Sequence, residues 1–150
     1  MTLPTRLRIA WQDDRTLTVE TDAGMQRRVF HFGGWKSERG APTWQGESIA
    51  AWEVGGGRGR GAAPPRGGSL KVVTTKLRPG YLRRNGVPYS NDAVVTEYWN
   101  LATERNGDTW ITITNMVDDP KYLRIPYVTA LHFKKEADGA KWDPTPCSSR

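Results

Sequence analysis

The chain is nearly devoid of cysteine and poor in histidine. Its 150 residues include one cysteine, Cys147, and two histidines, His31 and His132. A single cysteine excludes an intrachain disulfide, and these three residues do not have the spacing of a zinc site. We therefore expect no bound metal, and no sequence motif indicates a cofactor.

Long apolar runs are also missing. No stretch reaches the roughly 20 apolar residues that a membrane-spanning helix needs, so we expect no membrane span. Residues 1–5 lack the apolar core of a signal peptide. The protein is therefore expected to be either cytoplasmic or exported by means of a leader that this chain does not carry.

Positive charge is in excess but is not concentrated. Lysine and arginine number 22 against 16 aspartates and glutamates, which gives a net charge of +6. The basic residues stand singly or in pairs such as Arg27/Arg28, a pattern typical of a solvated surface. Residues 55–68 are rich in glycine and arginine but contain only fragments of an RNA-binding tract. We interpret them as a flexible loop and do not expect nucleic acid as a partner.

Aromatic residues, in contrast, are abundant and fall in short alternating runs. The chain has seven tryptophans and five tyrosines. Apolar and polar residues alternate with a period of two in eight segments, which is typical of half-buried strands. These segments cover residues 7–11, 17–21, 25–32, 43–54, 69–78, 97–105, 108–116 and 122–135.

These strands predict a single all-β domain over residues 1–150, since a chain of this length suits one domain. They follow one another in an antiparallel, up-and-down meander of about eight strands. Such a meander buries its edges by closing, so the predicted fold is a calycin-like or lipocalin-like barrel or half-barrel. Residues 138–150 are rich in turn-forming residues and are expected to form an irregular tail.

The dipeptide Asn106-Gly107 predicts the register of one hairpin, because it favours a two-residue turn. With this turn, Trp99 faces Thr114, and a slip of one residue would exchange the two faces of the strand. The face that we expect inside holds Glu97, Trp99, Leu101, Trp110, Thr112, Thr114 and Met116. The other face is partly apolar, which leaves open its cover by a loop or by a second copy in a homodimer.

Strand 43–54 indicates space inside the barrel. Gly46, Ser48 and Ala50 lie on one face between Trp44 and Trp52. Small residues between large ones leave room for a ligand, and eight strands enclose either side chains alone or one small ligand. The alternative is that bulky neighbours across the core fill this room.

Glu97 is the candidate for chemistry. Its carboxylate is expected on an aromatic face beside Trp99, where desolvation disfavours the charged form and suits a general acid or base. The alternative is that Glu97 pairs with an arginine or lies in water at the barrel mouth. His132 alternates away from Phe133 and is expected to face outward.

Residues 79–92 predict a long loop that carries aromatic and basic side chains, Tyr81, Arg83 and Tyr89 among them. Binding groups concentrate on loops held by rigid scaffolds, so this loop is a candidate lid over the barrel mouth. The alternative is a loop that is packed by its own side chains.

Several motifs together resemble a known group of proteins, in their order and spacing. They are PTWQGES (42–48), WE (52–53), LKVVTT (70–75), TEY (96–98) and VDDPKY (117–122). They are similar to a group of uncharacterised exported proteins of soil bacteria, and the resemblance covers residues 40–147. It implies a secreted or periplasmic protein, but it assigns no activity and no functional residue. If the longer relatives hold an upstream cysteine, the resemblance implies that Cys147 pairs with it.

The predicted function is the binding of a small, largely apolar or aromatic molecule in the barrel. Tryptophans form the walls, Ser48 and Thr112 orient the ligand, and Glu97 is the one strong polar group. The candidate ligand-binding residues are Trp44, Ser48, Trp52, Tyr81, Arg83, Glu97, Trp99, Trp110, Thr112 and Tyr127. The alternative is a cofactor-independent isomerase, lyase or hydrolase that uses Glu97 as acid or base. An interaction module, such as a homodimer, is a third hypothesis.

Overall fold

The structure, a computed structural model, describes residues 5–37, 40–54, 68–83 and 86–147. Most of the predicted glycine- and arginine-rich loop, residues 55–67, lies outside these ranges, as do the last three residues of the predicted tail. The described residues form strands and no helix. The strands are β1 (Leu7–Asp13), β2 (Thr16–Thr21), β3 (Arg27–His31), β4 (Glu47–Val54), β5 (Gly68–Thr75), β6 (Gly80–Tyr81), β7 (Pro88–Tyr89), β8 (Val94–Thr103), β9 (Thr109–Asp118) and β10 (Tyr127–Lys134).

One sheet of eight strands has the order β1-β2-β3-β4-β5-β8-β9-β10, and β6 pairs with β7 in a separate hairpin. The predicted all-β class and the chain order of the strands are confirmed. The strict up-and-down meander is not, because β3 and β4 run parallel. Parallel neighbours need a long connection that returns the chain to the starting side, and residues 32–46 provide it.

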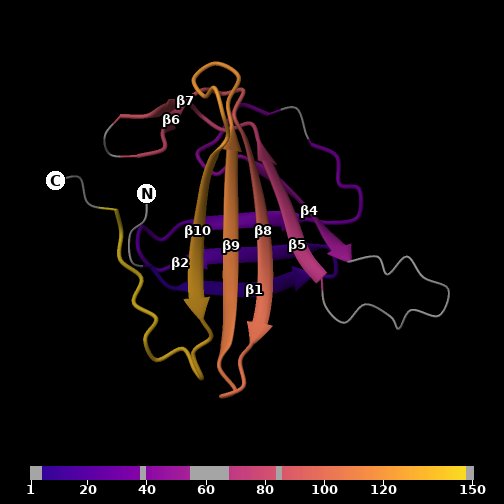
Figure 1. Cartoon of the computed structure of the whole chain (residues 1–150), viewed down its shortest axis with the longest axis vertical. Helices are drawn as coiled ribbons and strands as arrows, with labels where there is room; N and C mark the ends of the chain where they lie inside the picture. Colours follow the sequence, from indigo (N-terminus) through magenta and orange to yellow (C-terminus); the bar gives the residue numbers. More distant parts are fainter. Residues whose placement is uncertain (1–4, 38–39, 55–67, 84–85, 148–150) are drawn as a thin grey trace.

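The sheet curls over on itself into a half-barrel. Figure 1 shows β2 and β4 running across the view behind β8, β9 and β10, which run along it. The two layers therefore cross at a steep angle, as in orthogonal sheet packing. In the described part of the chain no pairing joins β1 to β10, so both remain edge strands.

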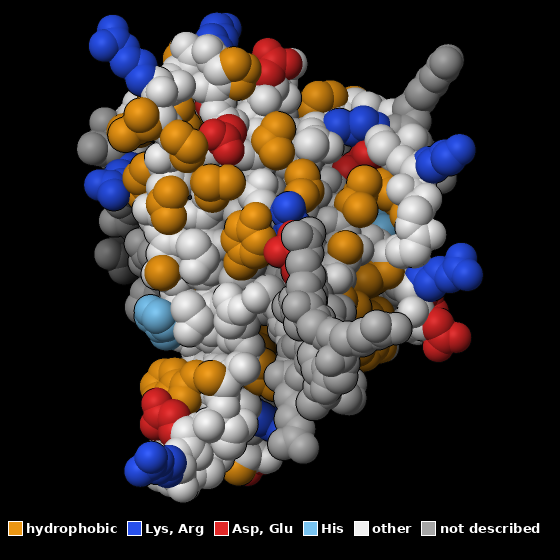
Figure 2. Space-filling view, turned by 45° about the vertical axis from the view of Figure 1, so that its right-hand side comes forward, with side chains coloured by type: hydrophobic (Ala, Val, Ile, Leu, Met, Phe, Trp, Pro, Cys, Tyr) orange, Lys and Arg blue, Asp and Glu red, His pale blue; other side chains and the backbone are white. Residues whose placement is uncertain are grey.

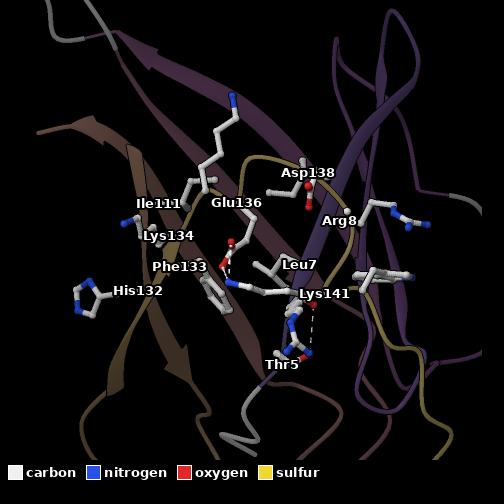
Figure 3. A pocket seen from close by; sticks show the side chains of 15 residues that line it. Thr5, Leu7, Arg8, Ile111, His132, Phe133, Lys134, Glu136, Asp138 and Lys141 are labelled. Carbon is white, nitrogen blue, oxygen red and sulfur yellow. Dashed lines mark hydrogen bonds and ion pairs between the residues drawn. The ribbon is translucent and has the colours of Figure 1, made fainter. Parts of the chain in front are cut away.

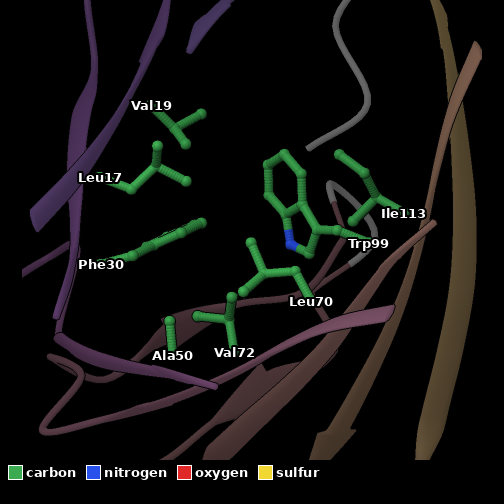
Figure 4. Close-up of a cluster of buried hydrophobic side chains, with 8 residues drawn as sticks. All are labelled: Leu17, Val19, Phe30, Ala50, Leu70, Val72, Trp99 and Ile113. Atoms are coloured by element: carbon green, nitrogen blue, oxygen red, sulfur yellow. The ribbon is translucent and has the colours of Figure 1, made fainter. Parts of the chain in front are cut away.

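The core lies between the two layers (Figure 4). Phe30 on β3 and Val72 on β5 have no exposed surface. The ring of Phe30 meets Trp99 of β8 edge to face, with 5.5 Å between their centroids. The buried cluster consists of Leu17, Val19, Phe30, Ala50, Leu70, Val72, Trp99 and Ile113.

The predicted register of the hairpin formed by β8 and β9 is wrong by one residue. Trp99 pairs with Ile113 and not with Thr114. The reason is the loop: Gly107 N–H donates to Glu104 at 3.0 Å, and Gly107 has a φ of 88°. The N–H of Glu104 also donates to the carbonyl of Asp108 at 2.8 Å. These two hydrogen bonds make a three-residue loop with a bulge at Gly107 instead of the two-residue turn. Four residues expected inside therefore lie on the outer face, namely Trp110, Thr112, Thr114 and Met116.

Neighbouring atoms occupy the space predicted beside the small residues of β4. A Cβ on Gly46, where φ is 63°, would lie 2.4 Å from the carbonyl oxygen of Thr75. Ala50 is buried in the core and pairs with Val72. Glycine at position 46 therefore permits close strand packing, and the interior of the curl is filled with side chains here.

Leucine truncation tests where the core lies. Leu70 is 5% exposed, whereas Leu101, also a strand leucine, is 68% exposed. Leu70→Ala should lower the free energy of unfolding by about 2–5 kcal/mol, because it leaves a cavity. Leu101→Ala should change it by no more than about 0.5 kcal/mol. Urea unfolding followed by tryptophan fluorescence measures both, and equal losses would contradict the assigned core.

Candidate functional site

A cluster of polar side chains inside the curl joins the two layers. Nη1 of Arg28 on β3 donates to Oε1 of Glu97 on β8 at 2.9 Å, and Nη2 donates to Oε2. The same Nη2 also donates to Oγ1 of Thr74 at 3.1 Å, and that hydroxyl is 2.8 Å from the hydroxyl of Ser48. Four strands, β3, β4, β5 and β8, therefore contribute to one hydrogen-bonded group.

The carboxylate of Glu97 is enclosed by this cluster and bonded to Arg28. The side chain of Glu97 is 6% exposed and that of Arg28 is 23% exposed. Both carboxylate oxygens of Glu97 already accept hydrogen bonds from the guanidinium. Of the alternatives for Glu97, pairing with an arginine is therefore the one that occurs.

Removal of one partner of this pair tests its role. Arg28→Met leaves the carboxylate of Glu97 buried without its counter-charge, which should cost about 3–5 kcal/mol of unfolding free energy. The double variant Arg28→Met/Glu97→Leu removes both charges and should be more stable than the single variant. Urea unfolding compares the two. A double variant that is no more stable than Arg28→Met would show that the loss does not come from the unpaired carboxylate of Glu97.

A groove of about 560 Å³ lies at the open side of the half-barrel, between the edge strands β1 and β10. Its apolar floor consists of Leu7, Ile111 and Phe133, which also pack against the buried core. Figure 3 shows residues of β1 on one side of the groove and those of β10 on the other. The groove is lined by Thr5, Arg6, Leu7, Arg8, Ile9, Ile111, His132, Phe133, Lys134, Lys135, Glu136, Asp138, Gly139, Lys141 and Trp142.

The tail after β10 forms one wall of this groove. Trp142 lies under Arg8 of β1, with the guanidinium carbon 4.3 Å from the centre of its ring. Farther along, Thr145 pairs with the turn after β2: its N–H donates to Asp22 at 2.9 Å, and its carbonyl accepts from Gly24 at 2.7 Å. The tail predicted to be irregular is therefore attached to the first strands by a ring contact and a short β-bridge.

The carboxyl group of Asp22 forms hydrogen bonds with Thr5 and Arg6, which line the groove and precede β1. It accepts hydrogen bonds from Thr5, from the backbone and side chain of Arg6, and from the N–H of Ala23. Burial raises the pKa of Asp22, but these donors outweigh that effect and hold the pKa well below its usual value. The ionised form is thus the one that the folded protein stabilises.

Acid should weaken this attachment. The folded protein lowers the pKa of Asp22, so its contribution to stability is complete above the unfolded value of about 3.9 and is lost as the pH falls below it. Asp22→Asn should therefore lose less stability than the unmodified protein between about pH 6 and pH 3. The control is Asp143→Asn, at an exposed position of the tail. Urea unfolding midpoints across this pH range measure the effect. If the midpoints of the unmodified protein and of Asp22→Asn fall in parallel as the pH falls, the stabilising role of ionised Asp22 is refuted.

None of the ten predicted site residues lines the groove. Ser48 and Glu97 lie in the interior polar cluster, and Trp99 is buried in the core. The indole Nε1 of Trp99 has no hydrogen-bond partner in the described part of the chain. The predicted residues near the interior therefore hold the two layers together and do not border an open pocket that the structure shows.

The remaining predicted residues are dispersed. Trp44, Trp52 and Tyr81 are exposed by 61%, 56% and 71%. Trp110 and Thr112 lie on the outer face, where the hydroxyl of Thr112 is 3.1 Å from Nδ1 of the exposed His132. Figure 2 shows hydrophobic side chains gathered in patches on one face of the molecule. The tryptophans consequently do not converge on one site.

The loop expected to be a lid forms, within the residues described, the short hairpin of β6 and β7. Leu82 donates to Val87 at 2.8 Å beside the β6–β7 pair, and a Cβ on Gly80 would lie 2.8 Å from the hydroxyl of Tyr89. Nε of Arg83 donates to the hydroxyl of Tyr127 at 2.6 Å. This contact brings two predicted residues together and attaches the hairpin to β10.

The fold and the groove define an all-β half-barrel with a side-chain-lined opening at its free edges. Comparisons of the chain with models of protein families, with curated proteins and with solved structures give no match. The resemblance to exported bacterial proteins therefore stays a prediction. No helix in the described ranges is long and apolar enough to cross a membrane. Within the same ranges, no three His, Cys, Asp or Glu side chains are grouped as a metal site.

Proposed function

We propose that the protein binds a small, largely apolar or aromatic molecule in the groove between β1 and β10. The observation that carries this proposal is the groove itself, whose volume of about 560 Å³ lies within the range of roughly 300–1,000 Å³ typical of ligand pockets. Its floor of Leu7, Ile111 and Phe133 offers apolar contact, and Trp142 offers an aromatic wall.

In this proposal the ligand lies at the open side of the half-barrel, whereas the sequence predicted a ligand at the centre of the barrel. A rigid sheet supplies the floor, and the tail supplies the wall through Trp142. In this sense the protein would act as a calycin-like carrier or receptor of a small molecule. The secreted or periplasmic location implied by the resemblance belongs to the same proposal.

The enzymatic alternative has less support. It requires a carboxylate beside an open cavity, but both oxygens of Glu97 are bonded to Arg28, and Glu97 does not border the groove. The carboxylates that do line the groove are Glu136 and Asp138. The latter accepts a hydrogen bond from the N–H of Ala140, which shapes the tail. Binding is therefore the function we propose.

The aromatic wall provides the test. Calorimetric titration with the neutral probe naphthalenemethanol should show binding. Trp142→Ala should weaken that binding at least about fivefold, since the aromatic contact alone contributes about 1 kcal/mol beyond the buried area. Trp44→Ala is the matched control, because Trp44 also lies under an arginine, 4.8 Å from Arg78, but is not part of the groove. No binding at millimolar concentration, or equal weakening by both variants, would refute the proposal.

A further inference from the structure

The groove carries more positive than negative charge. Five basic residues line it, Arg6, Arg8, Lys134, Lys135 and Lys141, against two acidic ones, Glu136 and Asp138. Arg6 and Lys134 are neutralised by Asp22 and Asp108, which do not line the groove, at 2.9 and 2.7 Å. Arg8 and Lys135 form no ion pair with a carboxylate of the described residues. With Lys141 paired to Glu136, Arg8 and Lys135 stand against Asp138 alone, so a net positive charge of one borders the apolar floor.

One carboxylate that lines this groove is already bound by a lysine. Nζ of Lys141 is 2.9 Å from Oε1 and 3.0 Å from Oε2 of Glu136, so the lysine holds both oxygens. In Figure 3 this pair meets between Phe133 and Leu7, as seen in that view. The groove therefore already contains a carboxylate, supplied by its own chain, that Lys141 binds.

We infer that the ligand of this groove is an amphipathic organic carboxylate whose charged group replaces Glu136 as the partner of Lys141. Its apolar body then lies on Leu7, Ile111 and Phe133. This inference rests on the proposed function, which it extends from an apolar molecule to an apolar molecule with an anionic end.

Such an exchange of partners costs little. The side chains of Lys141 and Glu136 are 62% and 48% exposed, and ion pairs this exposed contribute little to stability. The incoming carboxylate forms the same contact that the outgoing one gives up. Burial of the ligand's apolar part on the floor supplies the favourable free energy. Arg8 and Lys135 outnumber Asp138, and this net positive charge favours an anion over a neutral molecule.

Three probes with one ring system and different charge test the inference. Naphthoate is negative, naphthalenemethanol is neutral and naphthylmethylamine is positive at neutral pH. Calorimetry on the full chain at low salt should show naphthoate as the tightest ligand and naphthylmethylamine as the weakest. The preference for naphthoate should shrink as the salt concentration rises, because ions screen exposed charges.

Two variants locate the anion. Lys141→Met should weaken naphthoate by up to about fivefold, the range that an exposed ion pair contributes, and leave naphthalenemethanol unchanged. Glu136→Gln frees Lys141 and should strengthen naphthoate by a similar factor. The matched control is Lys71→Met, in an exposed pair with Glu53 at 3.3 Å outside the groove, which should alter neither probe.

The outcomes separate the inference from the function on which it rests. If all three probes bind equally, or Glu136→Gln leaves naphthoate unchanged, the carboxylate assignment is overturned while the proposed function stands. If no naphthalene compound binds, the proposed function fails and the inference fails with it. A weakening of naphthoate by Lys71→Met equal to that by Lys141→Met would also overturn the assignment.

Discussion

The buried ion pair between Arg28 and Glu97 is the contact on which the arrangement of the two layers depends. The two residues are 69 positions apart, on β3 and β8, so no local turn brings them together. Phe30 and Trp99 follow two positions later on the same strands and meet through their rings. Polar and apolar contacts thus bridge the same two strands. These contacts hold the sheet in its curled shape, in which β1 and β10 do not pair. The groove lies between these two edge strands.

Much of the secondary structure was predictable, because alternation of apolar and polar residues requires only that one face of a strand is buried. Segments such as 17–21 and 69–78 cover most of β2 and most of β5 for this reason. The parallel pairing of β3 with β4 was not predictable in the same way. It depends on where residues 32–46 return to the sheet, and alternation does not encode the direction of a strand.

The site was harder to predict than the fold, for two physical reasons. Gly107 adopts a left-handed conformation in either kind of hairpin loop, so its presence does not distinguish registers that differ by one residue. This shift of one residue in the register moves Trp110 and Thr112 to the outer face. The groove wall, in turn, comes from Trp142, in a segment without periodic pattern. The sequence places Phe133 on an inner face, but it does not show that β10 ends the sheet.

The unclosed sheet also has a consequence for how molecules of this protein meet one another. A free strand edge offers backbone donors and acceptors to any extended chain, which makes it a template for ribbon-like self-assembly. Here Arg8 on β1 and Lys135, directly after β10, are both exposed, and neither forms an ion pair with a carboxylate of the described residues. Two copies that approach through these margins bring like charges together. Repulsion at the margins therefore lets the sheet stay open, with its groove accessible, at a reduced risk of forming fibres.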